Sequence, residues 1–270
     1  MKKVSFSRKH LGIPYALFLL MFVVFPLLLI VFYAFTDADG SFTFENFINF
    51  FKLNANLTAL FISLGLALCT TVICILLAYP VAYFLAKSSS NRTGILLLLF
   101  ILPMWINFVL RTAAMKELLF ALGFFKSNKT SFLNTVIGMV YDYLPFAILP
   151  IYTVLSKMDK SLVEAAKDLG ASPFKAFLDV TLPLSKSGIA SAVTMIFLPT
   201  TTSYVISDTL GNGNITIIGK LIENQFSSVF NWNMGSAIAL ILLVVIFGTM
   251  LCTGKFTDKE AMNSRGSGLW

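Results

Sequence analysis

The sequence has little charge: only 12% of its 270 residues are Asp, Glu, Lys or Arg, about half the share in a typical soluble protein. Apolar residues make up 57%, so a soluble domain of this length would lack the polar surface needed to cover itself. The scarcity of charge argues against a soluble enzyme, a disordered chain and a nucleic-acid-binding module. The composition that remains is typical of a protein that crosses a membrane several times.

Histidine and cysteine are also scarce. His10 is the only histidine, and the three cysteines lie inside apolar runs without a Cys-x-x-Cys pair. These residues give no disulfide framework, zinc site or His-based catalytic triad. A G-x-x-x-x-G-K-[ST] phosphate loop and the G-x-S-x-G and H-E-x-x-H enzyme motifs are absent as well. We therefore predict a non-catalytic chain with no metal site and no cofactor of its own.

Six apolar runs are long enough, or nearly long enough, to cross a bilayer as helices. Asp142 is the only charged residue inside any of them. The first run exceeds the apolar region of a signal peptide and has no clear cleavage site after it, so we expect it to be retained. We predict an all-α membrane protein with six transmembrane helices in a single domain, 1–270. The predicted spans are 12–35, 57–86, 94–110, 132–155, 188–207 and 234–252.

The basic residues predict the orientation of these spans. With the N-terminus inside, 14 of the 20 Lys and Arg residues fall in inside segments and six in outside segments. Basic residues are enriched in cytoplasmic loops, so both termini are predicted to be cytoplasmic, with 253–270 as a loosely ordered tail. The segment 111–131 carries four of the outside charges, and we expect a short interfacial helix there, with Arg111 reaching the membrane surface from the end of the third span.

The segment 156–187 is long for a loop and carries its own helix signals. Ser161 and Glu164 form a capping-box pattern, and Gly170 follows as a C-terminal stop. Residues 172–173 are a Ser-Pro pair that starts a second helix, which 182–183 should end. The result is a pair of short amphipathic helices. Such a pair can lie on lipid, but its mixed charges favour docking to a soluble partner.

Residues 164–189 closely resemble the EAA signature of ABC importer permeases. The residues that carry this resemblance are Glu164, Ala165, Ala166, Gly170, Leu182 and Pro183. The resemblance implies the type I importer permease fold and two permease chains. It also implies an extracytoplasmic binding protein and two ATPase subunits that bind ATP and Mg. The helix from Ser161 would insert into an ATPase cleft, with Glu164 holding it in place by capping and contacts.

A second stretch, 197–226, is similar to spermidine/putrescine permeases, although Gly211-Asn212-Gly213 and Lys220 depart from their usual pattern. The basic N-terminus and first span are more similar to the first permease subunit of such systems. This resemblance implies a polyamine substrate, a polyamine-binding protein and a different second permease chain. The location implied is a bacterial cytoplasmic membrane.

Asp142 is the leading candidate for the substrate path, because an ionisable residue inside a membrane helix is expected to be functional. Tyr141 and Tyr143 beside it could offer cation–π faces to a polycation. The alternative is that Asp142 is a structural partner for a polar group on another span. Three further candidates for the path could equally be ordinary interfacial residues: Trp105, Tyr204 and Asp208.

Rival functions remain open at this point. An ion-coupled secondary transporter would use Asp142 as a proton or sodium site, but it has no need of the segment 156–187. An importer permease for iron, sulfate or an amino acid would share every feature of the signature. Specificity in such systems rests largely with the separate binding protein.

Overall fold

The computed structural model of the protein describes residues 12–88, 93–126 and 130–266, with side chains described up to Leu251. Regular structure in these ranges consists of helices, together with an isolated antiparallel bridge between Thr36 and Phe42. The chain groups into two compact units. Unit 1 comprises Met1–Leu57 and Leu221–Val244, and unit 2 comprises Thr58–Lys220 and Val245–Trp270.

Unit 1 contains the first apolar run, which forms one uninterrupted helical stretch, Gly12–Ala34. Its middle is a π-helical turn, η2 (Leu20–Val24), flanked by α1 (Gly12–Leu19) and α2 (Phe25–Ala34). Pro26 lies two residues after the end of this turn. Proline has no N–H and clashes with the carbonyl four residues earlier in a regular helix, and a widened turn at this point accommodates both effects.

The ends of two helices are joined within unit 1 by the side-chain amide of Asn233. Its Nδ2 donates to the backbone oxygen of Thr36 at 2.7 Å and to that of Asp37 at 3.2 Å. These carbonyls follow the C-terminus of α2, where backbone acceptors lack helical partners. The remaining helices that lie wholly or partly in unit 1 are α3 (Glu45–Lys52), α4 (Asn54–Lys87), α13 (Ile218–Ser227) and α14 (Trp232–Gly266).

Among the described residues, four helices are long and apolar enough to cross a membrane unaided. They match the runs predicted at 12–35, 57–86, 132–155 and 234–252. The two longest are α4 and α14, and the third run of this group forms α7 (Ser131–Lys157). The backbone of α14 stays helical to Gly266, into the region that we expected to be a loosely ordered tail.

The predicted span at 94–110 is not a single straight helix. Helix α5 (Thr93–Ile101) and the 3₁₀ turn η3 (Leu102–Trp105) are separated from α6 (Phe108–Ala121) by a 95° bend. Pro103 denies the helix a hydrogen bond, and the Asn107 side chain accepts the N–H of Val109 at 2.9 Å to start α6 anew. Asn107 is thus an N-cap that redirects the chain.

The predicted span at 188–207 is also divided. Helix α11 (Lys186–Thr202) ends at Ser203, and α12 (Tyr204–Leu210) follows. On its other side α11 meets the helical stretch Pro173–Leu184 at a 60° bend. Counting each bent pair as one span brings the number of candidate spans from four to at most six within the described residues.

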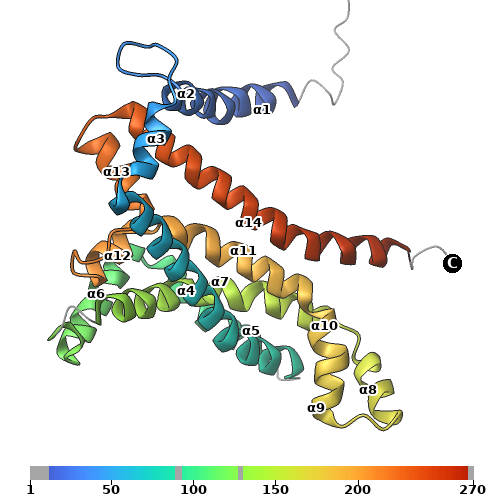
Figure 1. The fold of residues 1–270 in the computed structure, drawn as a ribbon. Helices are drawn as coiled ribbons and strands as arrows, with labels where there is room; N and C mark the ends of the chain where they lie inside the picture. The colour runs from blue at the N-terminus through green and yellow to red at the C-terminus, as the bar shows by residue number, and fades with distance from the viewer. Residues whose placement is uncertain (1–11, 89–92, 127–129, 267–270) are drawn as a thin grey trace, which may run out of the picture. The chain divides into compact units, whose positions relative to one another are not determined.

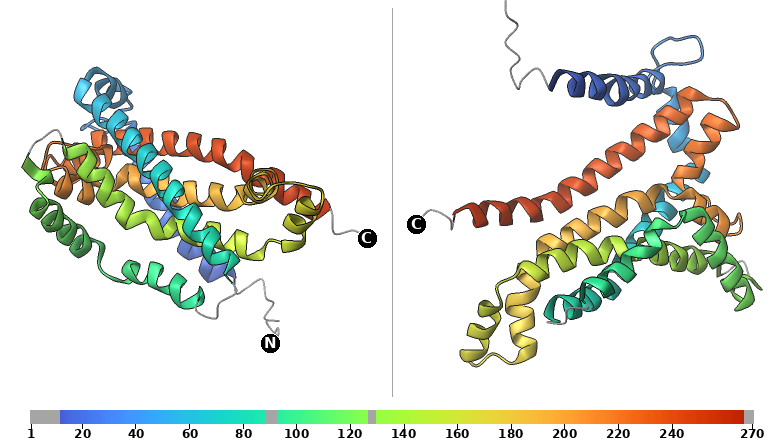
Figure 2. Two further views of the ribbon diagram at one scale, coloured as in Figure 1. Left: turned by 90° about the horizontal axis from the view of Figure 1, so that it is seen from below. Right: turned by 180° about the vertical axis from the view of Figure 1, so that it is seen from behind.

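The core of unit 2 lies where α7 and α11 run side by side and α4 packs against them (Figures 1 and 2). Small residues allow this close approach. A Cβ at Gly188 of α11 would lie 3.1 Å from the carbonyl oxygen of Pro150 on α7. The other buried small residues of this cluster are Ala78, Ala82, Ala147 and Ala192.

Candidate functional site

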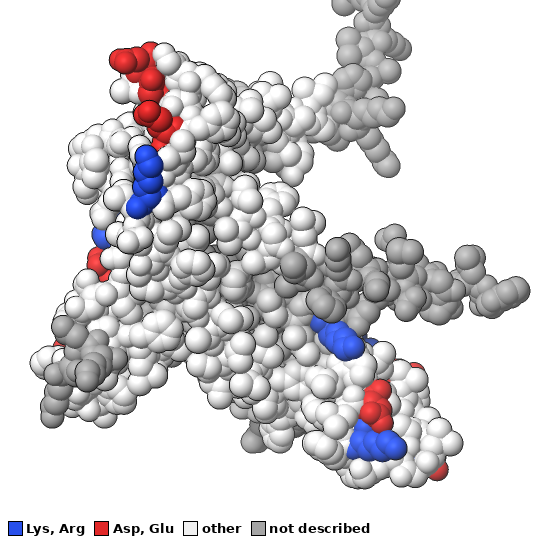
Figure 3. Space-filling view, in the orientation of Figure 1, with Lys and Arg blue, Asp and Glu red and all other residues white. Residues whose placement is uncertain are grey.

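A helical hairpin projects beyond the ends of α7 and α11 in unit 2 (Figure 1). Its first arm is α8 (Lys160–Asp168), and its second arm is formed by α9 (Pro173–Ala176), the π-helical turn η6 (Phe177–Thr181) and α10 (Leu182–Leu184). Charged side chains gather on this hairpin, whereas much of the neighbouring surface is uncharged in the same view (Figure 3). The hairpin is the segment that carries the EAA-like residues.

The first arm begins two residues earlier than the capping-box pattern predicts. Asp159 is the N-cap, and its side chain accepts the Ser161 N–H at 2.9 Å. The prediction of Ser161 as the cap is wrong because Asp159 lies nearer the end of α7 and is itself a strong cap residue. The hydrogen bond from the backbone N–H of Ser161 holds the pKa of the Asp159 carboxyl below its usual value.

Gly170 ends α8 as predicted. Its φ is +85°, which a residue with a side chain rarely adopts. The Gly170 N–H donates to the Lys167 carbonyl at 2.8 Å, and the Ala171 N–H donates to the Ala166 carbonyl at 3.0 Å. This paired pattern is a Schellman motif, and it turns the chain sharply between the two arms of the hairpin.

The second arm starts as predicted, with the Ser172 hydroxyl accepting the Lys175 N–H at 3.2 Å. It does not end at Leu182-Pro183, which corrects our expectation. The Leu182 N–H bonds to the Phe177 carbonyl, five residues back. This wide turn lets Pro183 follow without breaking the helix, as at Pro26, and the helix ends at Leu184.

The second arm is tied to α4 by aromatic contacts. The Phe177 ring lies between the rings of Tyr79 and Tyr83, with centroids 5.8 and 5.5 Å away in edge-to-face geometry. The Tyr79 and Ser185 hydroxyls are hydrogen bonded at 2.8 Å, and both are buried. Because Ser185 lies at the bend between α10 and α11, these contacts connect the hairpin to two long helices.

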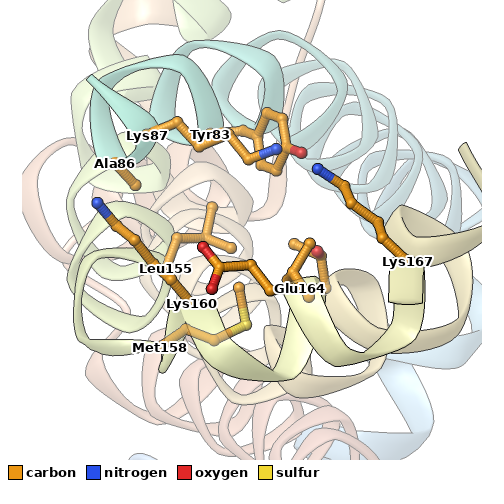
Figure 4. A pocket seen from close by; sticks show the side chains of 10 residues that line it. Tyr83, Ala86, Lys87, Leu155, Met158, Lys160, Glu164 and Lys167 are labelled. Carbon is orange, nitrogen blue, oxygen red and sulfur yellow. The ribbon is translucent and has the colours of Figure 1, made fainter. Parts of the chain in front are cut away.

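Helix α8 has two distinct faces. Lys160, Val163, Glu164 and Lys167 line a cavity of about 240 Å³ on the side of α4. Lys167 points from α8 toward Tyr83 of α4, and the Glu164 side chain points into the cavity that the two helices line (Figure 4). In this chain, therefore, the Glu164 side chain turns toward α4.

The opposite face of the hairpin is open and apolar. Leu162, Leu169 and Phe174 are exposed, with Leu169 at 90%. Ala165 is exposed on the same side and Ala166 is half-buried. Monomeric proteins rarely leave such a patch uncovered, and two alanines at its centre permit a partner to approach closely.

A second candidate site lies in unit 2 around a buried ion pair. Arg111 Nη2 on α6 is 3.1 Å from Asp142 Oδ1 on α7, and the two side chains are only 7% and 4% exposed. The Thr112 hydroxyl donates to the other Asp142 oxygen at 3.2 Å. Our expectation that Arg111 reaches the membrane surface is therefore wrong, because the bend at Asn107 turns it toward the carboxylate.

This ion pair borders a cavity of about 400 Å³ that Trp105 and Tyr143 also line. Tyr143 further lines a neighbouring hollow of about 290 Å³ together with Tyr204. Four of the six predicted path residues thus lie around two adjacent hollows. The other two stand apart: Tyr141 is 40% exposed with its ring 5.8 Å from the Arg111 guanidinium, and Asp208 pairs with Lys220 at 3.6 Å.

Sequence reasoning missed several residues of these sites: Tyr79, Arg111, Phe177 and Ser185. Arg111 had a usable signal, since a lone carboxylate in an apolar span requires a partner and Arg111 adjoins an apolar run. The aromatic contacts had no signal in the sequence, because they join segments roughly a hundred residues apart. Among the described residues, no cluster of His, Cys, Asp and Glu could hold a metal ion.

Known proteins with similar sequences include spermidine/putrescine permeases. The chain is 35% identical over 248 residues to the spermidine/putrescine transport system permease protein PotB of Haemophilus influenzae, covering 84% of this chain and 86% of the relative. It is 32% identical to PotB of Escherichia coli strain K12, covering 86% and 91% of the two chains.

The fold is shared with a bacterial ABC transporter involved in the import of the acidic polysaccharide alginate. One chain of that crystal structure matches with a TM-score of 0.76 at 15% identity, covering 93% of this chain and 94% of the other. Residues 78–252 match the family described as binding-protein-dependent transport system inner membrane component. This chain belongs to that family, as a multi-pass membrane component of an ABC importer.

Proposed function

We propose that this chain is a permease subunit of an ATP-driven polyamine importer in a bacterial cytoplasmic membrane. The observation that carries the proposal is the similarity to spermidine/putrescine permeases along most of the chain. The chain itself is not an enzyme, and ATP with Mg is bound and hydrolysed by two partner ATPase subunits. An extracytoplasmic polyamine-binding protein delivers the substrate, and a second, different permease chain completes the path.

The proposed topology has six spans in one domain, 1–270, with each bent helix pair counted as one crossing and with both termini cytoplasmic. The segment 156–187 then faces the cytoplasm as the coupling loop. The asymmetry of basic residues supports this orientation. The open apolar face of the hairpin supports contact with an ATPase subunit, with Ala165 and Ala166 at the contact.

Coupling in this proposal passes along the hairpin. An ATPase that closes on its nucleotide displaces α8, and the Schellman turn at Gly170 passes the displacement to the second arm. The contacts of Phe177 with α4 and of Ser185 with Tyr79 then move the long helices. Leu182 and Pro183 keep the second arm helical up to the bend, so it acts as a rigid lever.

The substrate path in this proposal follows the two hollows in unit 2. Trp105, Tyr143 and Tyr204 offer aromatic faces to an ammonium group, and Asp142 offers the only carboxylate. Tyr141 and Asp208 would contribute farther along the path. Arg111 already neutralises Asp142, so a polyamine must compete with the guanidinium for the carboxylate.

An amino acid permease is the second candidate, and one observation favours it. A guanidinium and a carboxylate line the same cavity, and together they could receive both charges of a zwitterion. The two candidates differ in which solute the transporter carries.

Uptake in cells tests the proposal. Accumulation of labelled spermidine, putrescine and a panel of amino acids is compared in cells with and without this chain, with its partner genes intact. The proposal predicts loss of polyamine uptake alone. Loss of amino acid uptake with normal polyamine uptake would establish the second candidate instead.

A further inference from the structure

The cavity between α8 and α4 has features that the coupling role does not use. Three lysines from two helices face it: Lys87 at the end of α4, and Lys160 and Lys167 on α8 (Figure 4). Among the described residues of the lining, Glu164 is the one carboxylate. Neither Glu164 nor any of these lysines takes part in an ion pair in the described part of the chain. The lining therefore carries an excess of two positive charges.

A buried hydroxyl adds a second, independent feature. Thr181 lines the same cavity, is only 1% exposed, and its Oγ1 has no hydrogen-bond partner among the described residues. A helical threonine usually donates to the carbonyl four residues back, but the π-helical turn gives the Phe177 carbonyl to Leu182. A buried polar group without a partner is destabilising, so this hydroxyl is available to a ligand.

The rest of the lining is apolar or aromatic. Leu155 and Met158 from the end of α7 form part of it, with Val163 of α8. Tyr83 places its ring 4.4 Å from the Lys87 ammonium nitrogen, which fixes that cation at the cavity. A lining that combines lysines with apolar side chains suits a phosphate group that is attached to an apolar chain.

We propose that this cavity binds a phosphate group that bridges Lys87 with the lysines of α8. The phosphate can belong to the headgroup of an acidic phospholipid or to free inorganic phosphate. The lipid source rests on the proposed cytoplasmic orientation of α8, beside the inner leaflet. A bound phosphate joins the coupling helix to α4 and restrains the motion of one against the other. Glu164 opposes the anion, so binding depends on the lysines.

The test uses the assembled transporter, purified in detergent and depleted of lipid. Binding of phosphatidylglycerol, phosphatidylcholine and inorganic phosphate is measured separately by native mass spectrometry and by equilibrium dialysis. Each lysine near an anionic group contributes about 1 kcal/mol, or about fivefold in affinity. The double variant Lys87→Gln/Lys167→Gln should therefore lose about 25-fold. Lys175→Gln, the matched control in the same hairpin, removes an exposed charge outside the cavity and should change binding less than twofold.

Thr181→Val keeps the proposal testable if the lysine variants assemble poorly. It removes the hydroxyl without changing volume, so assembly should be unimpaired while phosphate binding falls. Preference for phosphatidylglycerol over phosphatidylcholine identifies the lipid source, and binding of inorganic phosphate alone identifies the free ion. If phosphatidylglycerol and inorganic phosphate bind the lysine and Thr181 variants as they bind wild type, the proposal is overturned. This test measures binding and not transport, so a negative result would leave the proposed polyamine transport untouched.

Discussion

Arg111 Nη2 lies 3.1 Å from Asp142 Oδ1, and both side chains are buried between α6 and α7. The carboxylate that the sequence marks as a substrate residue is therefore already paired with a cation from its own chain. Two further buried nitrogens of Arg111, Nε and Nη1, have no hydrogen-bond partner among the described residues. The pair ties α6 to α7, and in the proposed substrate path a polyamine would compete for its carboxylate.

Removing one member of this pair should destabilise the protein. Breaking a buried pair leaves an uncompensated charge and typically costs about 3–5 kcal/mol. Asp142→Asn and Arg111→Met should each lower the thermal stability of the purified transporter, whereas the double variant should recover much of the loss. Polyamine uptake by the stable double variant separates the two roles of Asp142. Uptake equal to wild type would make Asp142 purely structural, and uptake below one tenth would support a substrate contact.

The hydroxyl pair of Tyr79 and Ser185 should contribute to coupling. Ser185→Ala leaves the buried Tyr79 hydroxyl without its partner, at a cost of about 1–3 kcal/mol. Tyr79→Phe is the milder control, because the Ser185 hydroxyl still donates to the Leu182 carbonyl at 3.0 Å. In proteoliposomes, Ser185→Ala should transport fewer polyamines for each ATP hydrolysed than Tyr79→Phe does. Equal ratios in both variants and wild type would contradict this role.

The turn at Gly170 should tolerate asparagine better than alanine. A Cβ at this position meets no atom within 4 Å, so the cost is conformational, about 1–2 kcal/mol for an alanine held at positive φ. Asparagine adopts this region more readily. Proteolysis of the hairpin should therefore be fastest in Gly170→Ala and intermediate in Gly170→Asn. Wild-type rates of proteolysis in both variants would show that the turn tolerates a side chain at this position.

The open face of the hairpin should be sensitive to bulk at its centre. Ala165→Trp and Ala166→Trp should each reduce co-purification of the ATPase subunits and uncouple uptake from ATP hydrolysis. Val229→Trp, an equally bulky change at an exposed site outside the hairpin, should leave both unchanged. Normal ATPase association and uptake in the two alanine variants would place the ATPase contact elsewhere.

Much of the fold was predictable because hydropathy alone determines a long membrane helix. The runs that form α4 and α7 agree with the structure within three residues at each end. The bend within the run at 94–110 was not predicted. Pro103 ends one helix and Asn107 caps the next, and a count of apolar residues detects neither effect. A proline alone does not predict a helix break, since the π-helical turns before Pro26 and Pro183 let the helix continue.

The site was predictable only in part. Gly170 and Ser172 were identified because capping follows from local sequence. Asp159 and Ser161 compete for the same helix start, and the position of the preceding helix end decides between them. The Arg111–Asp142 pair and the Phe177 contacts depend on how distant segments meet, which the spacing of residues along the chain does not encode.

ATP-dependent uptake by the reconstituted transporter tests the central claim most directly. This chain and its permease and ATPase partners are placed in proteoliposomes with ATP and Mg at the ATPase side, and labelled spermidine with the binding protein on the other side. We predict accumulation that requires ATP, the binding protein and this chain. Spermidine accumulation driven by an ion gradient without ATP, or none while another solute accumulates, would contradict the account.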